Sequence, residues 1–352
     1  MDSIDWYIHY VRFEMKGVNM MEENQTGFSK VTTDEAKPIV QNDEKKVKPK
    51  WYENLIVYYV VTVALLYVGT FAGMLVTQVP VLVYYQMKAK QAGIDLDLNL
   101  QIPSTVTVGL NYVIFIGIWI ATLLWLLKKN NRFILKTVGK GQNNTILWLL
   151  AGLAIGFVTN GICILAAYLH HDISLTFDSF SLVPLVVIFI CVSIQSSAEE
   201  LICRGYLYQK LMKRYNKPVL AIVANSLLFA LLHLGNEGVT VLSVINIFLV
   251  GIAFSLMVYY LDSIWCAMAA HAAWNFTQNI IFGLPNSGME ALYSVFKLDM
   301  TTARDSFAYD VGFGVEGTIV AALVQVATCV VIVLYGIHKK KKSQQNADIC
   351  EA

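Results

Sequence analysis

Long apolar runs recur along the chain from about residue 54 onward, and short polar or charged segments separate them. Each run comes close to the roughly 20 residues with which a helix crosses about 30 Å of hydrocarbon. In lipid, a spanning segment must be helical to satisfy its own backbone groups. The pattern therefore predicts an all-α fold, a polytopic transmembrane helix bundle of about eight spans. The expected spans are residues 54–79, 105–127, 145–169, 181–198, 217–235, 240–261, 263–283 and 316–337.

Composition supports a membrane protein. Of the 352 residues, 56% are hydrophobic and 14% are charged, whereas roughly 25% of residues are charged in ordinary soluble domains. We therefore expect the lipid bilayer to be the protein's surroundings. The formal net charge of +1 gives no support for a nucleic-acid partner. The six cysteines are scattered, so we expect small core residues rather than a disulfide framework or a metal site.

Charge patterning divides the chain into three parts. Residues 1–50 are polar and are expected to form a disordered tail, residues 51–338 the transmembrane bundle, and residues 339–352 a basic tail. Clusters of lysine and arginine precede the first expected span and follow the second, fourth and eighth spans, which puts all four clusters on one side. Because basic residues near span ends stay in the cytoplasm, we expect a multi-pass protein of the cell membrane with both termini cytoplasmic.

Two pairs of glycines lie four residues apart within the expected spans, Gly69 with Gly73 and Gly152 with Gly156. Small residues at this spacing let two membrane helices approach each other closely. Such pairs are frequent by chance, so we assign them a packing role alone.

Two carboxylates, Glu199 and Glu200, lie deep in the apolar part of the chain. A charge at the bilayer centre costs about 2.5–3.5 kcal/mol even on the lenient insertion scale, so such residues are usually functional or paired. Arg204 follows Glu200 by four residues and shares its helix face, which predicts a structural ion pair. Glu199 is rotated by about 100° from Glu200. Glu199 therefore has no charged partner on its own helix face. It is either a polar residue solvated in a water-filled cavity, with no catalytic role, or part of a reaction centre.

Two histidines and an amide are the other polar groups deep in the apolar runs. If the helix of Glu199 continues to a turn near Asn216, then Glu199 and His233 both lie about 24–26 Å from that turn and hence at matching depth. His271 and Asn275 share one face of a later helix, because they are four residues apart. A lone buried histidine is more often a satisfied core residue than a catalyst. Three helices that each contribute such a group favour a shared site.

These side chains together suit hydrolysis. A carboxylate beside a histidine can deprotonate water, provided that burial raises the affinity of the carboxylate for a proton. A second histidine with an amide donor can stabilise the oxyanion that forms when this water attacks a carbonyl. The set therefore predicts a hydrolytic site within the membrane.

Three short motifs carry a family resemblance. The segments EExxxRG from Glu199, FxxxH from Phe229 and HxxxN from His271 resemble, in the same order, the motifs of the CPBP family. This family comprises the CAAX prenyl protease and bacteriocin-processing enzymes, also called Abi proteins. The resemblance covers a core at residues 181–283 and rests on the combination, because each motif alone is weak.

The resemblance implies an intramembrane endopeptidase that cuts a membrane-tethered or amphipathic peptide or protein substrate. In that mechanism, Glu199 with His233 activates the water, and His271 with Asn275 binds the oxyanion. Glu200 and Arg204 would be structural support. CAAX-type cleavage, bacteriocin or peptide processing, and self-immunity all remain open.

A zinc site is the alternative to this mechanism, with the glutamates and histidines as ligands. Two histidines, a carboxylate and an open fourth position would suit catalytic zinc. We favour a site without a cofactor, because the amide of Asn275 suits an oxyanion hole better than a zinc shell.

Two functions without proteolysis remain as alternatives. A non-catalytic membrane regulator or bacteriocin-immunity protein of the same fold would bind a peptide or a sensor kinase. A proton- or metal-coupled transporter would use buried glutamate and histidine as a relay. Such transporters are built from internal repeats, and the sequence holds no second EExxxR-like segment.

Overall fold

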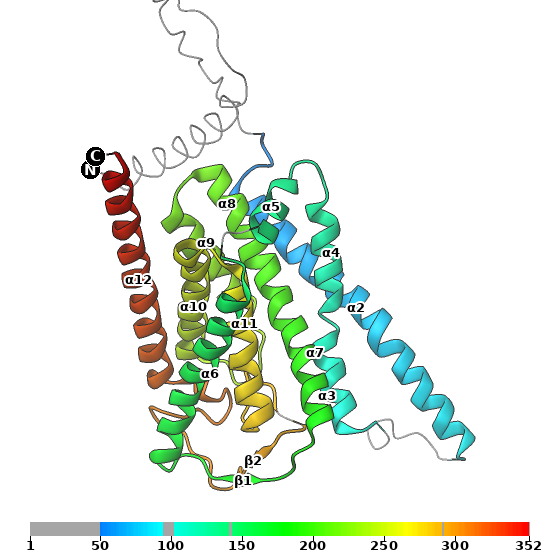
Figure 1. The fold of residues 1–352 in the computed structure, drawn as a ribbon. Helices are drawn as coiled ribbons and strands as arrows, with labels where there is room; N and C mark the ends of the chain where they lie inside the picture. The colour runs from blue at the N-terminus through cyan, green and yellow to red at the C-terminus, as the bar shows by residue number, and fades with distance from the viewer. Residues whose placement is uncertain (1–49, 94–101, 141–142, 291, 352) are drawn as a thin grey trace, which may run out of the picture. The chain divides into compact units, whose positions relative to one another are not determined.

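The computed structural model describes residues 50–93, 102–140, 143–290 and 292–351. From Lys50 onward these residues form one compact unit of helices packed side by side (Figure 1), which confirms the predicted all-α bundle. A two-stranded antiparallel sheet joins two connecting segments at one end, with Leu175 opposite Leu298. The predicted disordered tail at residues 1–50 lies, except for Lys50, outside the described residues.

Eleven α-helices carry most of the described chain. In order they are α2 (Leu55–Gln91), α3 (Ser104–Val113), α4 (Ile116–Leu126), α5 (Arg132–Lys140), α6 (Ile146–Leu169), α7 (Leu182–Glu200), α8 (Tyr208–Tyr215), α9 (Pro218–Leu231), α10 (Val241–Leu256), α11 (Ile264–Asn275) and α12 (Ile319–Glu351). Short elements complete the order. They are the π-helical segments η2 (Leu201–Leu207), η3 (Met257–Leu261) and η4 (Phe276–Ile281), the 3₁₀ turn η5 (Val315–Gly317), and the strands β1 (Leu175–Phe177) and β2 (Phe296–Leu298).

All eight expected apolar runs are helical, but fewer of them are long and apolar enough to cross a membrane. By length and composition, six helical stretches of the described chain meet that requirement. They are Leu55–Gln91, Ser104–Leu126, Ile146–Leu169, Leu182–Tyr215, Val241–Leu261 and Ile319–Gln345. The two remaining runs correspond to α9, which has 14 residues, and to α11 with η4, which is rich in polar residues. The count of eight spans therefore becomes six by this measure.

The polar helix α11 lies inside the bundle. Every residue of α11 except Trp265 and Met268 is buried, whereas α2 exposes large apolar side chains along much of its length. Because α11 is surrounded by protein, its polar groups meet other side chains instead of hydrocarbon. The bundle thereby provides an interior in which a polar site can be built.

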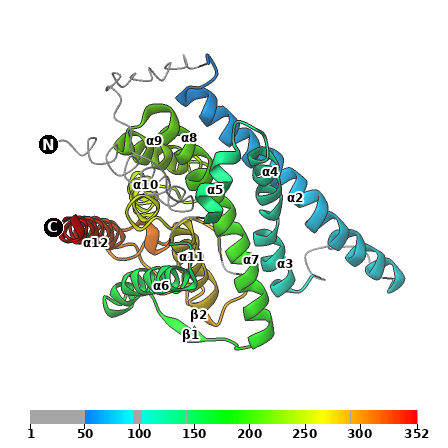
Figure 2. The same ribbon diagram turned by 45° about the horizontal axis from the view of Figure 1, so that its top comes forward.

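The two glycine pairs act in packing, as predicted. Side chains at Gly152 and Gly156 would collide with the backbone of α11 at Cys266 and Ala270. Likewise, Gly69 and Gly73 leave no room between α2 and the start of α4. Figures 1 and 2 show both helix pairs lying side by side. The first contact fixes α11 against α6, and α11 carries two of the predicted site residues.

The helix of Glu199 continues past Gly205, as the count of matching depths requires. The segments α7, η2 and α8 form one helical stretch from Leu182 to Tyr215. Asn216 ends it in the left-handed conformation with φ of 51°, which asparagine tolerates better than most residues. Pro218 then occupies the first turn of α9, a position that suits proline.

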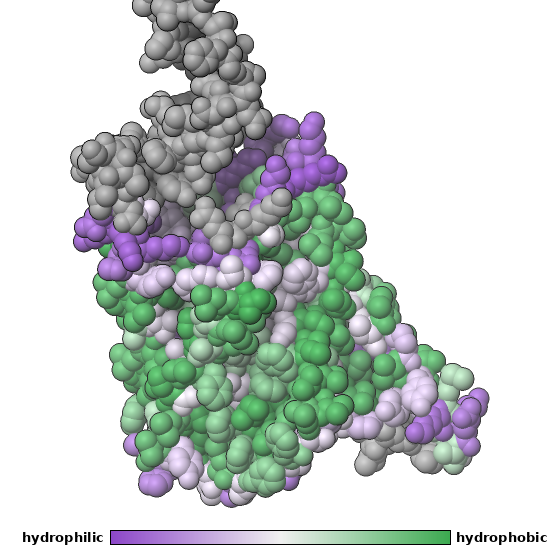
Figure 3. Space-filling model, in the orientation of Figure 1, coloured by the Kyte–Doolittle hydropathy of each residue, from purple (hydrophilic) through white to green (hydrophobic). Residues whose placement is uncertain are grey.

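Basic residues gather at one end of the bundle, where α2 begins and α12 ends. Figure 3 shows hydrophilic residues at this end and an apolar surface along the sides. The side chain of Arg214 donates to the carbonyl of Glu53 at 2.7 Å, and Lys210 donates to Asn131 at 3.2 Å, which joins three of the predicted basic clusters. The basic residues 339–342 continue α12 at the same end (Figure 1). The side of the membrane that this end faces stays a prediction.

The five cysteines whose side chains are described are free, and four of them are buried. They contribute to the apolar core, as expected from their positions in the sequence. Cys350 lies outside the described side chains.

Candidate functional site

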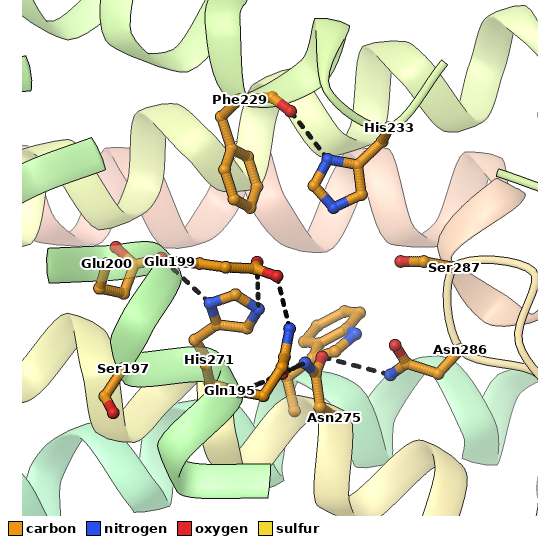
Figure 4. Close-up of polar contacts among 12 residues, drawn as sticks. Gln195, Ser197, Glu199, Glu200, Phe229, His233, His271, Asn275, Asn286 and Ser287 are labelled. Carbon is orange, nitrogen blue, oxygen red and sulfur yellow. Dashed lines mark hydrogen bonds and ion pairs between the residues drawn. The ribbon is translucent and has the colours of Figure 1, made fainter. Parts of the chain in front are cut away.

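A cavity of about 270 Å³ lies in the interior of the bundle. Glu199, His233, His271 and Asn275, the four side chains predicted to be catalytic, all line it. They come from α7, from the turn that follows α9, and from α11. Figure 4 shows these side chains converging from their separate helices. The structure therefore brings together residues that are up to 76 positions apart in the sequence, as Glu199 and Asn275 are.

The predicted ion pair between Glu200 and Arg204 is present and fully buried. The guanidinium Nη1 lies 3.0 Å from Glu200 Oε1, and neither side chain is exposed. Its Nη2 donates to the carbonyl of Gly251 on α10 at 2.9 Å. The guanidinium also lies 4.5 Å from the ring centroid of Phe229 and 5.4 Å from that of Phe254. Arg204 thereby ties η2 to both α9 and α10.

Glu199 has different surroundings, although it is the adjacent residue. Its Oε1 accepts a hydrogen bond of 2.6 Å from Gln195 Nε2, one turn earlier on α7. Its buried Oε2 accepts no hydrogen bond in the described part of the chain, and lies 3.8 Å from Nε2 of His271. The side chain is 13% exposed, towards the cavity that it lines. Oε2 of Glu200 also lacks a hydrogen-bond partner in the described residues, but it is fully buried, whereas Glu199 lines the cavity. Glu199 is therefore the acid whose unpartnered oxygen can meet a ligand.

His271 lies between the two glutamates. Its Nδ1 is 3.0 Å from Oε1 of Glu200, and an ionised carboxylate only accepts, so this nitrogen carries a proton. Its Nε2 faces Glu199. The ring stacks on Phe254 at 5.2 Å with an interplanar angle of 23°. Two carboxylates and one aromatic face thus fix the orientation of the imidazole.

His233 is oriented by the backbone. Its Nδ1 donates to the carbonyl of Phe229 at 2.8 Å, and in an imidazole that carries its single proton on Nδ1, Nε2 is the acceptor nitrogen. The expected mechanism pairs Glu199 with His233. In the described residues, however, no hydrogen bond or ion pair joins these two side chains. Glu199 is paired with His271 instead, and His233 lines the same cavity separately. The reason is the rotation of α11, which turns His271 towards both carboxylates.

A row of amides extends from Glu199 across the cavity wall. Gln195 donates to Glu199, Asn275 donates to Gln195 Oε1 at 3.1 Å, and Asn286 donates to Asn275 Oδ1 at 3.2 Å. Because the carboxylate can only accept, it fixes the orientation of each amide in turn. A second bond of Asn275, at 3.3 Å, goes to the hydroxyl of Ser196. The amide nitrogen of Asn275 therefore donates to two neighbouring acceptors in this structure.

Two π-helical segments begin directly after the site residues. The segment η2 starts at Leu201, after Glu200, and η4 starts at Phe276, after Asn275. Widened turns of this kind occur often at functional sites. Here they change the helical register directly after the site residues, and Ile202 and Cys203 of η2 still line the cavity.

The part of the chain that holds these helices matches a family model. Residues 178–277 match the family Rce1-like, described as type II CAAX prenyl endopeptidase Rce1-like. The match supports the resemblance of this segment to the CPBP family of intramembrane proteases. It contains α7 to α11 and all six side chains assigned from the motifs, although it is less than a third of the chain. No curated protein and no solved structure matches the chain.

Several polar residues of the cavity were missed by the sequence analysis, and some of them lie outside the Rce1-like segment. Asn286, Ser287 and Glu316 line the cavity from the connection between η4 and α12. Gln195, inside the segment, precedes Glu199 by four residues, so helical spacing alone could have indicated it. No sequence periodicity marks the other three, because they belong to loops or a short turn.

Glu316 holds this connection in place. One carboxylate oxygen accepts from the indole of Trp274 at 2.8 Å, and the other accepts from the backbone N–H and hydroxyl of Ser287 at 2.6 and 2.7 Å. Burial raises the pKa of Glu316, which lies before α12, and these donors oppose part of that rise. Ser287 follows Asn286, so Glu316 fixes the loop that donates to Asn275.

The described residues, inside and outside the Rce1-like segment, contain no set of side chains that would serve as the ligands of the zinc alternative. No group of three or more histidine, cysteine, aspartate or glutamate side chains is arranged there to hold a metal ion. The nearest combination joins His271 to the two glutamates, and there Nδ1 of the ring is already bound to Glu200. We therefore assign no chemical step to a metal.

Proposed function

We propose that the protein is an intramembrane endopeptidase in which Glu199 activates the water nucleophile. The observation that carries this proposal is the state of Oε2 of Glu199, a buried oxygen without a hydrogen-bond donor at the wall of a cavity. A buried acceptor of this kind costs free energy unless something occupies the space beside it. A water molecule or a substrate group would satisfy it. The match to a protease family supports hydrolysis.

The proposed reaction uses Glu199 first as base and then as acid. Glu199 takes one proton from water as the water oxygen bonds to the carbonyl carbon of the peptide, and the carbonyl electron pair moves to its oxygen. When the C–N bond breaks, Glu199 returns the proton to the leaving nitrogen. His233 assists by accepting a hydrogen bond from the same water at Nε2, because its Nδ1 is committed to the backbone.

His271 and Asn275 are proposed to bind the oxyanion. The buried set holds two carboxylates, of Glu199 and Glu200, against the single guanidinium of Arg204. The oxyanion role requires Nε2 of His271 to be a donor. Asn275 must release one N–H to take part, and its longer bond, to Ser196, is the one that opens most readily.

The cavity lining suits a peptide that carries apolar groups. Aromatic and aliphatic side chains of α2, α3 and α10 make up much of its wall, among them Tyr67, Tyr112 and Phe254. Tyr67 is 67% exposed on the outer face of α2, so the wall reaches the surface that faces lipid. We propose lateral entry of a membrane-tethered or amphipathic substrate along this wall. CAAX-type cleavage, peptide processing and self-immunity are all compatible with such a route.

A comparison of new peptide termini in membranes tests the proposal. Cells would express the wild type, Glu199→Gln or the control variant Glu237→Gln at matched levels. Glu237 is exposed and does not line the cavity, so its variant makes the same chemical change away from the site. We expect termini that occur with the wild type and with Glu237→Gln and that disappear with Glu199→Gln. Identical profiles in all three would contradict proteolysis and favour a non-catalytic regulator or immunity protein of the same fold.

A further inference from the structure

A second cavity, of about 400 Å³, lies at the basic end of the bundle and is separate from the candidate active site. Its walls come from the start of α2, the end of α4 with the turn that follows, and the stretch from η2 into α8. Small-molecule sites in proteins typically measure roughly 300–1,000 Å³. The proposed hydrolysis uses no residue of this cavity.

Lysines dominate the charged groups of this cavity. Lys128, Lys129 and Lys210 line it, against a single carboxylate, that of Glu53. Glu53 also accepts a hydrogen bond of 3.1 Å from the backbone of Lys50. The cavity therefore carries a net positive charge and favours an anionic occupant.

Lys210 is the most informative of these residues, because its side chain is enclosed. The residue is 9% exposed. Its ammonium donates to the neutral side chain of Asn131 at 3.2 Å and lies 5.3 Å from the ring centroid of Tyr58. No carboxylate lies within 4 Å of it in the described chain. A buried charge needs a partner, and an ammonium has three donors, so this lysine has donors left for an anion.

The deeper wall is apolar and aromatic. Val57, Tyr58, Val61 and Trp125 line it, and Lys128 lies over the ring of Trp125 at 3.8 Å. The cavity also lies where the apolar stretches of α2 and α4 end and the basic residues begin, which is the level of lipid headgroups. A soluble anion would leave the apolar wall without a partner, whereas a lipid matches both parts.

We propose that this cavity binds the phosphate of an anionic phospholipid headgroup, with Lys210 and Lys129 as its main ligands. Basic pockets between membrane helices are a known way of holding such headgroups. Lys210 lies on the same continuous helical stretch as Glu199, so a bound lipid would stabilise the end of the helix that presents the proposed base. The proposal is independent of the catalytic role of Glu199.

Native mass spectrometry of the full-length protein tests the proposal. The protein would be released from nanodiscs of phosphatidylcholine with phosphatidylglycerol, and the retained phosphatidylglycerol would be counted. We expect the wild type to retain this lipid and Lys210→Met to bind it about fivefold more weakly, the effect of one interfacial lysine. The control is Lys213→Met, which removes an exposed charge three residues further along α8, outside the cavity.

A second variant and a second ligand complete the test. Lys129 is exposed at the rim, so Lys129→Met should fold even if Lys210→Met does not, and it should also weaken retention. Equal retention by Lys129→Met, Lys210→Met and Lys213→Met would overturn the site. Inorganic phosphate added to protein in phosphatidylcholine alone distinguishes the source of the phosphate. If it raises the melting temperature as much as phosphatidylglycerol does, then the assignment to a lipid is overturned.

Discussion

Glu199 and Glu200 are neighbours in the sequence, but they lie in two differently built regions of the molecule. Around Glu200, the region is closed, since this carboxylate is fully buried and bound to both Arg204 and His271. Around Glu199, the region is open, because one oxygen has a single amide donor and the other faces the cavity. In the proposed mechanism, adjacent positions on one helix thus separate a structural role from a chemical one.

The contrast between the surroundings of Glu200 and Glu199 suggests how a membrane bundle can position a carboxylate for the proposed reaction. The buried ion pair and its aromatic neighbours lock η2, α9 and α10 together, and this rigid region orients His271 from one side. Its other nitrogen is then directed at Glu199 without a competing partner. In the proposed mechanism, Glu199 therefore depends on the contacts of Glu200 with Arg204 and His271, and substitutions on the two sides should have separable effects.

The largest effect on rate is expected at the open side. Glu199→Gln preserves the shape of the side chain but removes the base, so the cleavage rate should fall by about 10²–10⁴-fold. The melting temperature in detergent should stay close to that of the wild type, because Glu199 makes no ion pair shorter than 3.8 Å. Assays of substrate cleavage and thermal unfolding of the same preparation check both parts. Unchanged cleavage would contradict the assignment of Glu199 as base.

On the closed side, the expected loss is one of stability. Arg204→Met removes the guanidinium that pairs with the fully buried Glu200, which should cost about 3–5 kcal/mol of the free energy of unfolding. The double variant Glu200→Gln with Arg204→Met removes both charges and should recover a large part of that loss. Unfolding in detergent at several denaturant concentrations measures the difference. An unchanged stability of Arg204→Met would show that the two regions do not differ in the way described.

Asn275 belongs to the row of amides that begins at Glu199, and its loss should affect the transition state. Asn275→Ala removes one proposed oxyanion donor and should lower kcat by about 10²–10³-fold. Steady-state kinetics separates this effect from substrate binding. A change confined to KM would assign Asn275 to binding the substrate instead.

Glu316 provides a third carboxylate environment and the smallest expected effect. Burial raises its pKa above the ordinary 4.5, so the folded state binds this proton more tightly than the unfolded state does. The resulting stability is complete below the ordinary pKa and is lost as the pH rises through the raised value. The variant Glu316→Gln has no carboxyl group at this position, so its stability does not fall with pH for this reason. The melting-temperature advantage of the wild type over Glu316→Gln should therefore shrink as the pH rises from about 4.5, and a constant difference would contradict it.

Much of this arrangement could be predicted from local sequence. Spacing along one helix predicts the pair of Glu200 with Arg204, and the count of residues around Asn216 brings Glu199 and His233 to one cavity. Glycine spacing predicts that the helices of Gly152 and Gly156 approach a neighbour closely. Each of these features depends on the rise and rotation of a single helix, which the sequence determines directly.

Features that depend on how helices turn against one another could not be predicted. His271 pairs with both glutamates because of the rotation of α11 within the bundle, and no spacing in the sequence encodes that angle. Asn286 and Glu316 reach the cavity from the connection before α12, far along the chain from Glu199. Their contacts are long-range, so neither hydrophobic periodicity nor the motifs could indicate them.

The enclosed position of α11 has a consequence for biogenesis. This helix carries His271 and Asn275 and continues into the polar segment η4, and it is not among the stretches apolar enough to cross a membrane by length and composition. During synthesis, its insertion must therefore draw on neighbours already in the bilayer, above all α6, whose glycines contact it directly. The nascent chain would thus acquire a complete site late, after its outer helices are in place.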